Sequence, residues 1–380
     1  MKKIAIIGAS YLQEPLIQKA KQKGLETHVF AWAANDVGEK SADHFYPISI
    51  VEKDQILEKC REIGIDGICS IASDLGIITV NYVAEKMGLI GNPMSCVEVS
   101  TNKHRMRQCF EKNGDPSPKS YQVTSVEDLK GIDLSYPVIV KPVDRSGSRG
   151  ITELYDPAGL PEAIDRAIEQ GFEKCALVEE FAEGQEYSVE YISWEGKHHF
   201  LALTKKYTTG SPDFIETGHL EPAPVSEDVL KRVRDVVSHA LTSLGIRYGA
   251  SHSELKISDT GEIKLIEIGG RMGGDQIGAD LVQLSTGYDF VAAVLDIALG
   301  IEPKYEKTKS SCAGVRFVFS KKDVEVLERL KKEHPEILIE EDVHEITEEK
   351  VTDSGHRFGY YLFSADDMDV VRGYLPEDGK

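Results

Sequence analysis

Residues 247–276, RYGASHSELKISDTGEIKLIEIGGRMGGDQ, contain two runs, SHSELKI and EIKLIEI, in which polar and apolar residues alternate. The Asp-Thr-Gly at 259–261 separates the runs, and this pattern is typical of a hairpin that joins antiparallel strands. Because the side chains of a strand alternate between its two faces, His252 and Glu254 are expected on one face, with Glu267 opposite on the partner strand. The stretch therefore predicts a strand pair with two carboxylates on one face.

Two facing carboxylates favour a divalent cation between them. Glu254 and Glu267 have no Cys or His cluster beside them in the sequence, and oxygen ligands of this kind suit Mg²⁺ or Mn²⁺ together with substrate phosphates. The glycines at 269–274 let the backbone approach a ligand closely, and Arg271 among them adds a fixed cation. The alternative for this stretch alone is a solvated surface hairpin with a glycine turn.

The composition limits the classes of partner. With 380 residues, two or three domains are expected, and a formal charge of −20 argues against a nucleic-acid partner, which requires a basic face. Local lysines can still hold ATP. Six cysteines without C-x-x-C spacing suggest free thiols in a reducing cytosol, and no apolar run approaches a membrane span. We therefore expect a cytoplasmic protein with no membrane partner.

Residues 1–98 alternate short apolar runs with helical patterns. This βαβαβ rhythm predicts an α/β domain with a Rossmann-like parallel sheet and helices at 14–23, 53–63 and 75–87. The first strand ends without G-x-G-x-x-G, so dinucleotide binding is weakly supported. Ser73, with Asp74, follows a predicted strand at the edge where α/β sheets bind ligands. These two residues are candidate substrate contacts or ordinary turn residues.

Basic and small residues mark the next segment. Lys103 opens a predicted helix and, taken singly, would be a solvated lysine. Lys141 ends a short buried strand, and the loop at 144–150, DRSGSRG, follows it. The backbone N–H groups and hydroxyls of such a loop can cradle phosphates, although the G-K-[ST] of a Walker A motif is missing.

Further candidate contacts follow in the middle of the chain. A strand at 176–182 leads into a turn, so its backbone can meet an adenine edge and Glu186 can bind a ribose; the alternative is a hairpin with charged shoulders. Lys206 precedes a polar loop that ends at His219, and long loops inside compact domains are often functional. The last eighty residues predict a β-rich region with one helix at 322–333 and no chemistry of their own.

The order of these motifs along the chain resembles that of the ATP-grasp superfamily, and the resemblance covers nearly the whole chain. The matching features are the N-terminal α/β domain, Lys103, V-I-V-K-P at 138–142, the D-R-S-G-S-R-G loop, V-E-E-F at 178–181, G-Q-E-Y-S at 184–188, and the two acids before Arg271. The resemblance implies an N-terminal domain at 1–98, a two-lobed α+β ATP-grasp domain at 99–300 with its small lobe at about 118–185, and a small C-terminal subdomain at 301–380.

The resemblance also implies roles for individual residues. Glu254 and Glu267 would hold two Mg²⁺ ions, and the catalytic groups would be Arg271, Lys141 and His252. The residues assigned to ATP are Lys103, Lys141 and Lys206 for the phosphates, Ser146, Gly147 and Ser148 for the loop over them, Glu179, Glu180, Phe181 and Ala182 for the adenine hinge, and Glu186 for the ribose. The candidate substrate contacts are Ser73, His219, Gly273 and Gly274.

One position departs from the superfamily pattern. Many members carry Glu-x-Asn-x-Arg at the second acid, whereas this chain has Gly269 where the Asn metal ligand would stand. A water, or Glu267 bridging both ions, would have to replace that ligand. The segments GASHSELK and EIGGRMGGD, the T-x-x-x-x-F-I-E-x-G-H segment at 209–219 and CAGVRFVF look most like the L-amino-acid ligases.

The implied reaction joins a small carboxylate substrate to an amine. The carboxylate attacks the γ-phosphate of ATP, ADP leaves, and the amine then displaces phosphate from the acyl phosphate. His252 would accept or relay the amine proton, or else orient a partner by a hydrogen bond. The other interpretations are an enzyme that phosphorylates or carboxylates a small molecule, and a nucleotide-binding protein without turnover. Homodimers are common among similar enzymes.

Overall fold

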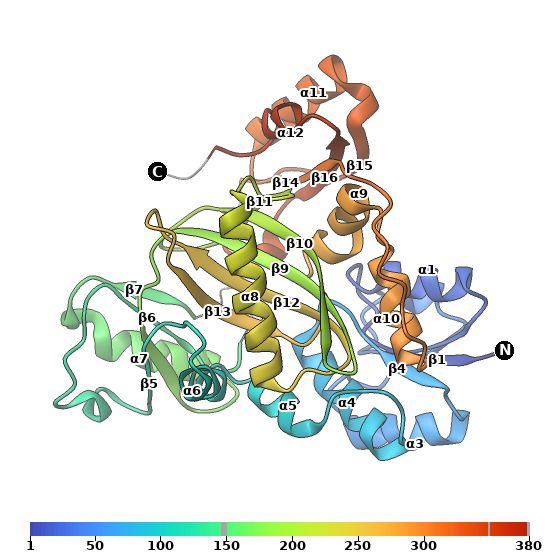
Figure 1. The fold of residues 1–380 in the computed structure, drawn as a ribbon, viewed down its shortest axis with the longest axis horizontal. Helices are drawn as coiled ribbons and strands as arrows, with labels where there is room; N and C mark the ends of the chain where they lie inside the picture. The colour runs from blue at the N-terminus through green and yellow to red at the C-terminus, as the bar shows by residue number, and fades with distance from the viewer. Residues whose placement is uncertain (146–149, 349, 378–380) are drawn as a thin grey trace.

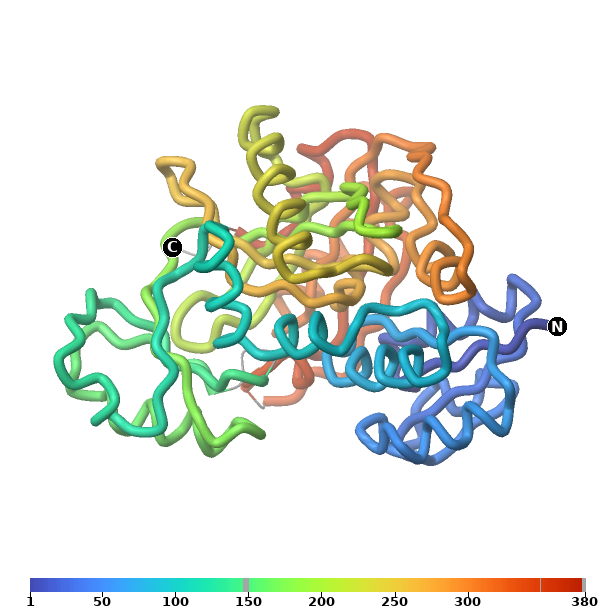
Figure 2. The backbone as a smooth tube through the Cα atoms, turned by 60° about the horizontal axis from the view of Figure 1, so that its bottom comes forward, coloured from blue at the N-terminus to red at the C-terminus, as the bar shows by residue number. Residues whose placement is uncertain are grey.

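A computed structural model describes residues 1–145, 150–348 and 350–377 (Figure 1). The chain is a mixed α/β protein with a parallel N-terminal sheet, as the sequence predicts, and its described residues also form two antiparallel sheets. Figure 2 shows the first residues, in blue, and the small antiparallel sheet region, in green, at opposite ends of the molecule, with the helices near residues 75–113 between them.

The four strands of the N-terminal sheet all run parallel to one another. Its order is β3 (His44–Tyr46), β2 (Glu26–Phe30), β1 (Lys3–Ile7) and β4 (Gly67–Cys69). Its helices are α1 (Glu14–Gln22), α2 (Val37–Ser41), α3 (Lys53–Ile63) and α4 (Asp74–Met87). The three predicted helices are confirmed within a residue, while the short α2 and β3 carry too weak a periodic signal to be predicted.

The small antiparallel sheet carries Lys141 and Glu179. Its order is β5 (Ser120–Val123), β8 (Ala176–Glu180), β6 (Val138–Pro142) and β7 (Thr152–Leu154), and α7 (Leu160–Gln170) packs on it through Ile164 and Ala167. Two helices, α5 (Met94–Ser100) and α6 (Lys103–Asn113), precede it. Asn102 caps α6 by accepting a hydrogen bond from the Arg105 backbone N–H, which fixes Lys103 at the start of the helix.

The large sheet is antiparallel and crosses the predicted boundary at residue 300. Its order is β13 (Ile263–Gly269), β12 (Gly249–Ile257), β9 (Gln185–Trp194), β10 (Lys197–Thr208), β11 (Glu216–Glu221), β14 (Cys312–Phe317), β16 (Gly359–Ala365) and β15 (Leu338–Val343). The last three strands thus continue the sheet that carries the glutamate hairpin. The domain boundaries themselves remain predictions.

Helices cover this sheet and join it to the N-terminal sheet. Figure 1 shows α8 (Glu227–Leu244) lying across the face of the large sheet. The segment Ile277–Leu281, α9 (Val282–Thr286) and α10 (Phe290–Ala298) follow the hairpin, and α11 (Lys321–Glu333) and α12 (Met368–Arg372) pack near the C-terminal strands. One apolar core, which contains Ile4, Leu201 and Phe290, unites α10 with both sheets.

Within the described ranges no single helix has both the length and the apolar content needed to cross a membrane. One pair of segments, Ile277–Thr286 and Phe290–Ala298, passes the test together by length and composition, with a bend of 119° between them.

A buried acid in the large sheet gives a testable dependence of stability on pH. Glu221 is fully buried in β11 and accepts hydrogen bonds of 2.6 Å from the Thr204 and Ser285 hydroxyls. Burial raises the pKa of Glu221 to about 7, with the two hydroxyls opposing the shift. A raised carboxyl pKa means that the folded state holds the proton longer, so stability falls as pH rises from the ordinary value of 4.5 through 7.

We expect Glu221→Gln to gain stability relative to the unsubstituted protein between pH 5 and pH 8. The amide keeps the shape without the buried charge, and the gain is at most about 3 kcal/mol. Urea unfolding of both proteins at the two pH values measures it. A stability difference that does not change with pH would mean that Glu221 has an ordinary pKa.

Candidate functional site

A pocket opens where the small sheet, the glutamate hairpin and α4 meet. Most of its lining side chains are charged, and several of the apolar ones, such as Ile139, Pro142 and Phe181, lie in or beside the small sheet. The charged lining residues are Asp74, Lys103, Lys141, Arg145, Glu179, Glu180, Glu186, Lys206, Glu216, His252, Glu254, Lys256, Glu267 and Arg271. Most of the residues that the sequence assigns to ATP and metal therefore lie together.

The glutamate hairpin forms as predicted, with the two acids directly opposite each other. Glu254 of β12 pairs in register with Glu267 of β13, and His252 pairs with Gly269. A β-bulge follows Glu254 and re-aims the strand. This register places both carboxylates in the lining of one pocket, which the alternative of a solvated surface hairpin does not explain.

Two lysines pair with these carboxylates. Lys103 Nζ at the start of α6 lies 2.7 Å from Glu267, and Lys206 Nζ of β10 lies 2.8 Å from Glu254. Although burial opposes ionisation, Lys206 holds the pKa of Glu254 well below its usual range. A metal ion can therefore replace the lysine at each carboxylate, and a phosphate can replace the carboxylate at each lysine.

Lys206 is a single cation among three carboxylates. Its Nζ also lies 2.6 Å from Glu186 and 3.5 Å from Glu216. Burial would lower the pKa of Lys206, but Glu186, Glu254 and Glu216 hold it well above its usual value. One ammonium cannot neutralise three carboxylates, so this end of the pocket is suited to a further cation. Glu216 received no role in the sequence, because a loop was expected up to His219.

His252 is held by a buried acid, Glu190, for which the sequence predicted no function. Its Nδ1 hydrogen-bonds Glu190 of β9, which is fully buried, and its Nε2 lies 3.5 Å from Glu254. Burial would lower the pKa of His252, but Glu190 raises it to about 9. The imidazole is therefore protonated at neutral pH. Glu190 and His252 are 62 residues apart in the sequence, so no local pattern indicates that they pair.

The glycine turn is shaped around this pair. The Gly273 backbone N–H donates a hydrogen bond of 3.0 Å to Glu190. A Cβ at Gly273 would lie 2.7 Å from His252 Nδ1 and 2.8 Å from Glu190 Oε1, so a larger residue would displace both. Gly274 faces Ala72, where a Cβ would make an ordinary contact of 3.4 Å. Of the two glycines, only Gly273 is required by close approach.

Arg271 connects the hairpin to the N-terminal sheet. Its guanidinium donates to both carboxylate oxygens of Asp74, at 2.7 and 3.1 Å. Burial opposes ionisation of Asp74, but Arg271 holds the pKa of that carboxyl below its usual value. Asp74 lines the pocket, whereas its neighbour Ser73 accepts a hydrogen bond from the Gly76 N–H as the cap of α4. Of the two candidate residues that follow β4, Asp74 is therefore the one that lines the pocket.

A buried charge triad supports the small-sheet side. Glu179 pairs with Lys141 and with Arg107 of α6, whose NH2 lies 3.0 Å away. Burial lowers the pKa of Lys141, and the nearby cations Arg107 and Lys103 lower it further, while Glu179 opposes them. Arg107 also donates to the Ile266 carbonyl, at 2.7 Å, so it ties α6 to the hairpin. The helix pattern of residues 103–112 did not reveal this role of Arg107.

The remaining predicted contacts are distributed as follows. Phe181 and Ala182 line the pocket, and Glu180 at its edge pairs with Lys264 at 2.8 Å. Lys256 lies over the Phe181 ring, 4.8 Å from its centroid. The predicted phosphate loop residues Ser146, Gly147 and Ser148 lie outside the described residues.

His219 differs from its expected position. It lies within β11 rather than at the end of a loop, opposite Lys206 in register, and its side chain is fully buried edge-on to Phe317. Within the described part of the chain, neither of its ring nitrogens has a hydrogen-bond partner. Burial and the Lys206 charge lower its pKa to about 3, so the ring is neutral. The polar composition of 208–217 concealed the start of β11 at Glu216.

Comparison with known proteins identifies one family model, the ATP-grasp domain, which matches residues 134–280. The alanine–anticapsin ligase of Bacillus subtilis (strain 168) is 27% identical over 279 residues, which is 67% of this chain and 58% of that protein. Carnosine synthase 1 of Gallus gallus is 24% identical over 80% of this chain and 36% of its own length. The chain thus spans less than two thirds of the curated relatives that it matches here.

Solved structures match along nearly the whole chain. The L-amino acid ligase from Bacillus licheniformis has a TM-score of 0.83 and 25% identity, over 98% of this chain and 96% of that one. The phosphoribosylglycinamide synthetase from Anaerococcus prevotii has a TM-score of 0.78 and 19% identity over all of both chains, a likeness of fold alone. The similarity therefore includes the N-terminal sheet and the C-terminal strands.

Proposed function

We propose, from the premise that residues 134–280 form an ATP-grasp domain, that this protein is an ATP- and Mg²⁺-dependent ligase. It joins the carboxylate of a small substrate, an amino acid by the likeness to the ligases named above, to an amine, with release of ADP and phosphate. The observation that carries the proposal is the pair Glu254 and Glu267, which are in register with each other and line one pocket together with Arg271.

The donor set fits magnesium. Glu254 and Glu267 offer only oxygen atoms, and each is paired with a lysine that a cation can replace. A carboxylate about 4 Å from a phosphate charge is repelled by roughly 4 kcal/mol at an effective dielectric near 20. Two carboxylates therefore tolerate a triphosphate only with cations between, and Mg²⁺, when bound, supplies that neutralisation. Gly269 offers no side-chain oxygen, so Glu254 and Glu267 are the residues of this hairpin that would hold the metal.

The cations of the pocket are placed for phosphates. Lys141 projects from β6 on the small-sheet side, and Lys103 and Arg271 lie on the hairpin side. Phosphoryl transfer asks a protein mainly for positioning and charge neutralisation, which three fixed cations supply. On nucleotide binding we expect Lys103 to leave Glu267 and to hold a phosphate oxygen instead.

The reaction takes two steps, activation of the carboxylate and attack by the amine. The substrate carboxylate attacks the γ-phosphorus of ATP, the bond to the ADP oxygen breaks, and an acyl phosphate forms. The neutral amine then attacks the acyl carbon, phosphate leaves with one former carboxylate oxygen, and the amine proton passes to solvent or a base. Arg271, held by Asp74, is placed to neutralise the charge that develops on the transferred group.

The contacts of His252 favour an orienting role over proton acceptance. Its Nδ1 hydrogen-bonds the buried Glu190, and its Nε2 lies 3.5 Å from Glu254. We therefore expect His252→Ala to slow ADP formation and amide formation by the same factor, because both depend on Glu190 and Glu254 being held in place. Single-turnover measurements of both rates on one preparation give this ratio, which is insensitive to partial loss of folded protein. A selective loss of amide formation would instead make His252 the base.

A substrate matrix tests the ligase. ADP and phosphate release is measured with ATP and Mg²⁺ against pairs of amino acids and amines, with mass spectrometry of the products and Glu267→Gln as the blank. The proposal predicts release that requires both an acid and an amine, and a product mass equal to their sum less water. ADP release with no amine requirement would instead indicate phosphorylation or carboxylation of one substrate. ATP binding without turnover for any pair would contradict the proposal for those substrates.

A further inference from the structure

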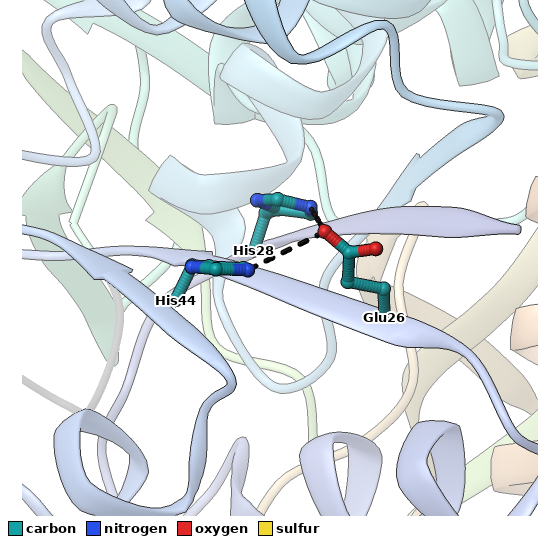
Figure 3. A group of neighbouring side chains, drawn as sticks. All are labelled: Glu26, His28 and His44. Atoms are coloured by element: carbon teal, nitrogen blue, oxygen red, sulfur yellow. Dashed lines mark hydrogen bonds and ion pairs between the residues drawn. The ribbon is translucent and has the colours of Figure 1, made fainter. Parts of the chain in front are cut away.

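Three metal-ligating side chains meet at the open edge of the N-terminal sheet. Glu26 and His28 are two residues apart in β2, so their side chains share one face. His44 of the edge strand β3 is in register with His28 and lies on the same face. Figure 3 shows a ring nitrogen of each histidine directed at the carboxylate of Glu26.

We propose that Glu26, His28 and His44 form a binding site for a divalent transition metal, Zn²⁺, that is separate from the nucleotide pocket. None of the three is among the described residues that line that pocket. The inference does not depend on the ligase activity.

The distances suit a metal with short bonds. Glu26 Oε1 lies 3.1 Å from His28 Nε2 and 3.4 Å from His44 Nε2, and one ligand atom from each of the three residues lies within 4.8 Å of the others. Tetrahedral ligands at the usual zinc bond lengths are about 3.4 Å apart. The rings are stacked with an interplanar angle of 15°, so His44 must tilt for both lone pairs to converge. Its side chain is 52% exposed and has room to do so.

The ligand types select the metal. Two imidazole nitrogens and one carboxylate oxygen are typical of zinc sites that keep a fourth position for water, whereas Mg²⁺ prefers oxygen ligands. The set carries one negative charge when both histidines are neutral. It therefore attracts a dication without burying an excess of charge.

The surroundings of His28 resemble the support that metal-bound histidines receive. Its Nδ1 lies 3.1 Å from the Tyr46 hydroxyl, a partner that fixes the ring and leaves Nε2 toward Glu26. Asp43 is engaged on the other face by Thr27, and does not compete for the same position.

Zinc binding to the full-length protein tests the site. Chelator-treated protein is titrated with ZnCl₂ in a large excess of Mg²⁺, which keeps Glu254 and Glu267 occupied, against a chromophoric chelator. We expect one Zn²⁺ per chain, and at least a tenfold weaker affinity for His44→Ala and for Glu26→Gln. The matched control is His344→Ala, because His344 is an exposed histidine that pairs with Asp342 at 3.8 Å, and this variant should bind Zn²⁺ as the unsubstituted protein does.

Two further readouts separate this site from adventitious binding. Co²⁺ in place of Zn²⁺ should give a visible absorption band that His44→Ala lacks, and Zn²⁺ should raise the Tm of the unsubstituted protein but not of His44→Ala. Both histidine variants change exposed side chains, so their Tm values without metal should match the parent. No Zn²⁺ binding in excess Mg²⁺, or an unchanged affinity in His44→Ala, would overturn the proposal.

Discussion

Arg271→Met is expected to lower ADP release by about 10³-fold at saturating ATP and Mg²⁺. A positioned arginine on a transferring phosphoryl group contributes at this scale. The substitution also leaves Asp74 without its bidentate partner, at 2.7 and 3.1 Å, so an unpaired carboxylate then faces the phosphates. Steady-state ADP release with an active acid and amine pair measures the loss.

The chain offers a matched control for this change. Arg316 forms a similar pair with Asp323, with N–O distances of 3.0 and 2.8 Å, and lies in β14 outside the described pocket lining. Arg316→Met therefore removes an equivalent ion pair and should leave the rate constant of the folded protein unchanged. If Arg271→Met retains activity within tenfold of the parent, Arg271 does not act on the transferred group.

Glu267→Gln is expected to abolish magnesium-dependent turnover while strengthening ATP binding when magnesium is absent. With Mg²⁺, loss of one of two carboxylate ligands should reduce turnover by about 100-fold or more and raise the Mg²⁺ concentration required. In EDTA the sign reverses, because the substitution removes a negative charge that repels the phosphates by up to roughly 4 kcal/mol. Calorimetric titration of both proteins with ATP, in Mg²⁺ and in EDTA, measures how the substitution changes the ATP affinity in each condition.

Glu262→Gln is the control for Glu267→Gln, because Glu262 lies in the turn of the same hairpin and its side chain is 65% exposed. It should change neither turnover nor ATP affinity. Equal ATP affinity of Glu267→Gln and the parent in EDTA, together with unchanged Mg²⁺ dependence, would remove Glu267 from the metal site.

The local patterns in the sequence predicted the hairpin correctly because alternation is a property of a few neighbouring residues. Strand period and the turn predict the paired strands, whereas the exact facing of Glu254 and Glu267 also needs the β-bulge after Glu254, which the alternation does not reveal. The parallel N-terminal sheet follows in the same way from alternating strands and helices. The whole resemblance rested on such local pieces taken in order.

The partners of these residues depend on packing between distant segments, which a single sequence does not encode locally. Asp74 and Arg271 are 197 residues apart, and Arg107 meets Glu179 across 72 residues. The extension of the large sheet by β14, β16 and β15 depends in the same way on the long-range pairing of β11 with β14. His219 was misplaced because the polar residues before it gave no strand signal, although β11 begins at Glu216.

The fate of one carboxylate oxygen tests the proposed chemistry most directly. Amino acids labelled with ¹⁸O in both carboxylate oxygens are supplied one at a time with unlabelled ATP, Mg²⁺ and an amine, and the released phosphate is analysed by mass spectrometry. An acyl phosphate intermediate predicts one ¹⁸O atom in each phosphate released during amide formation. Amide product accompanied by unlabelled phosphate would contradict activation of the carboxylate by ATP, and with it the ligase mechanism.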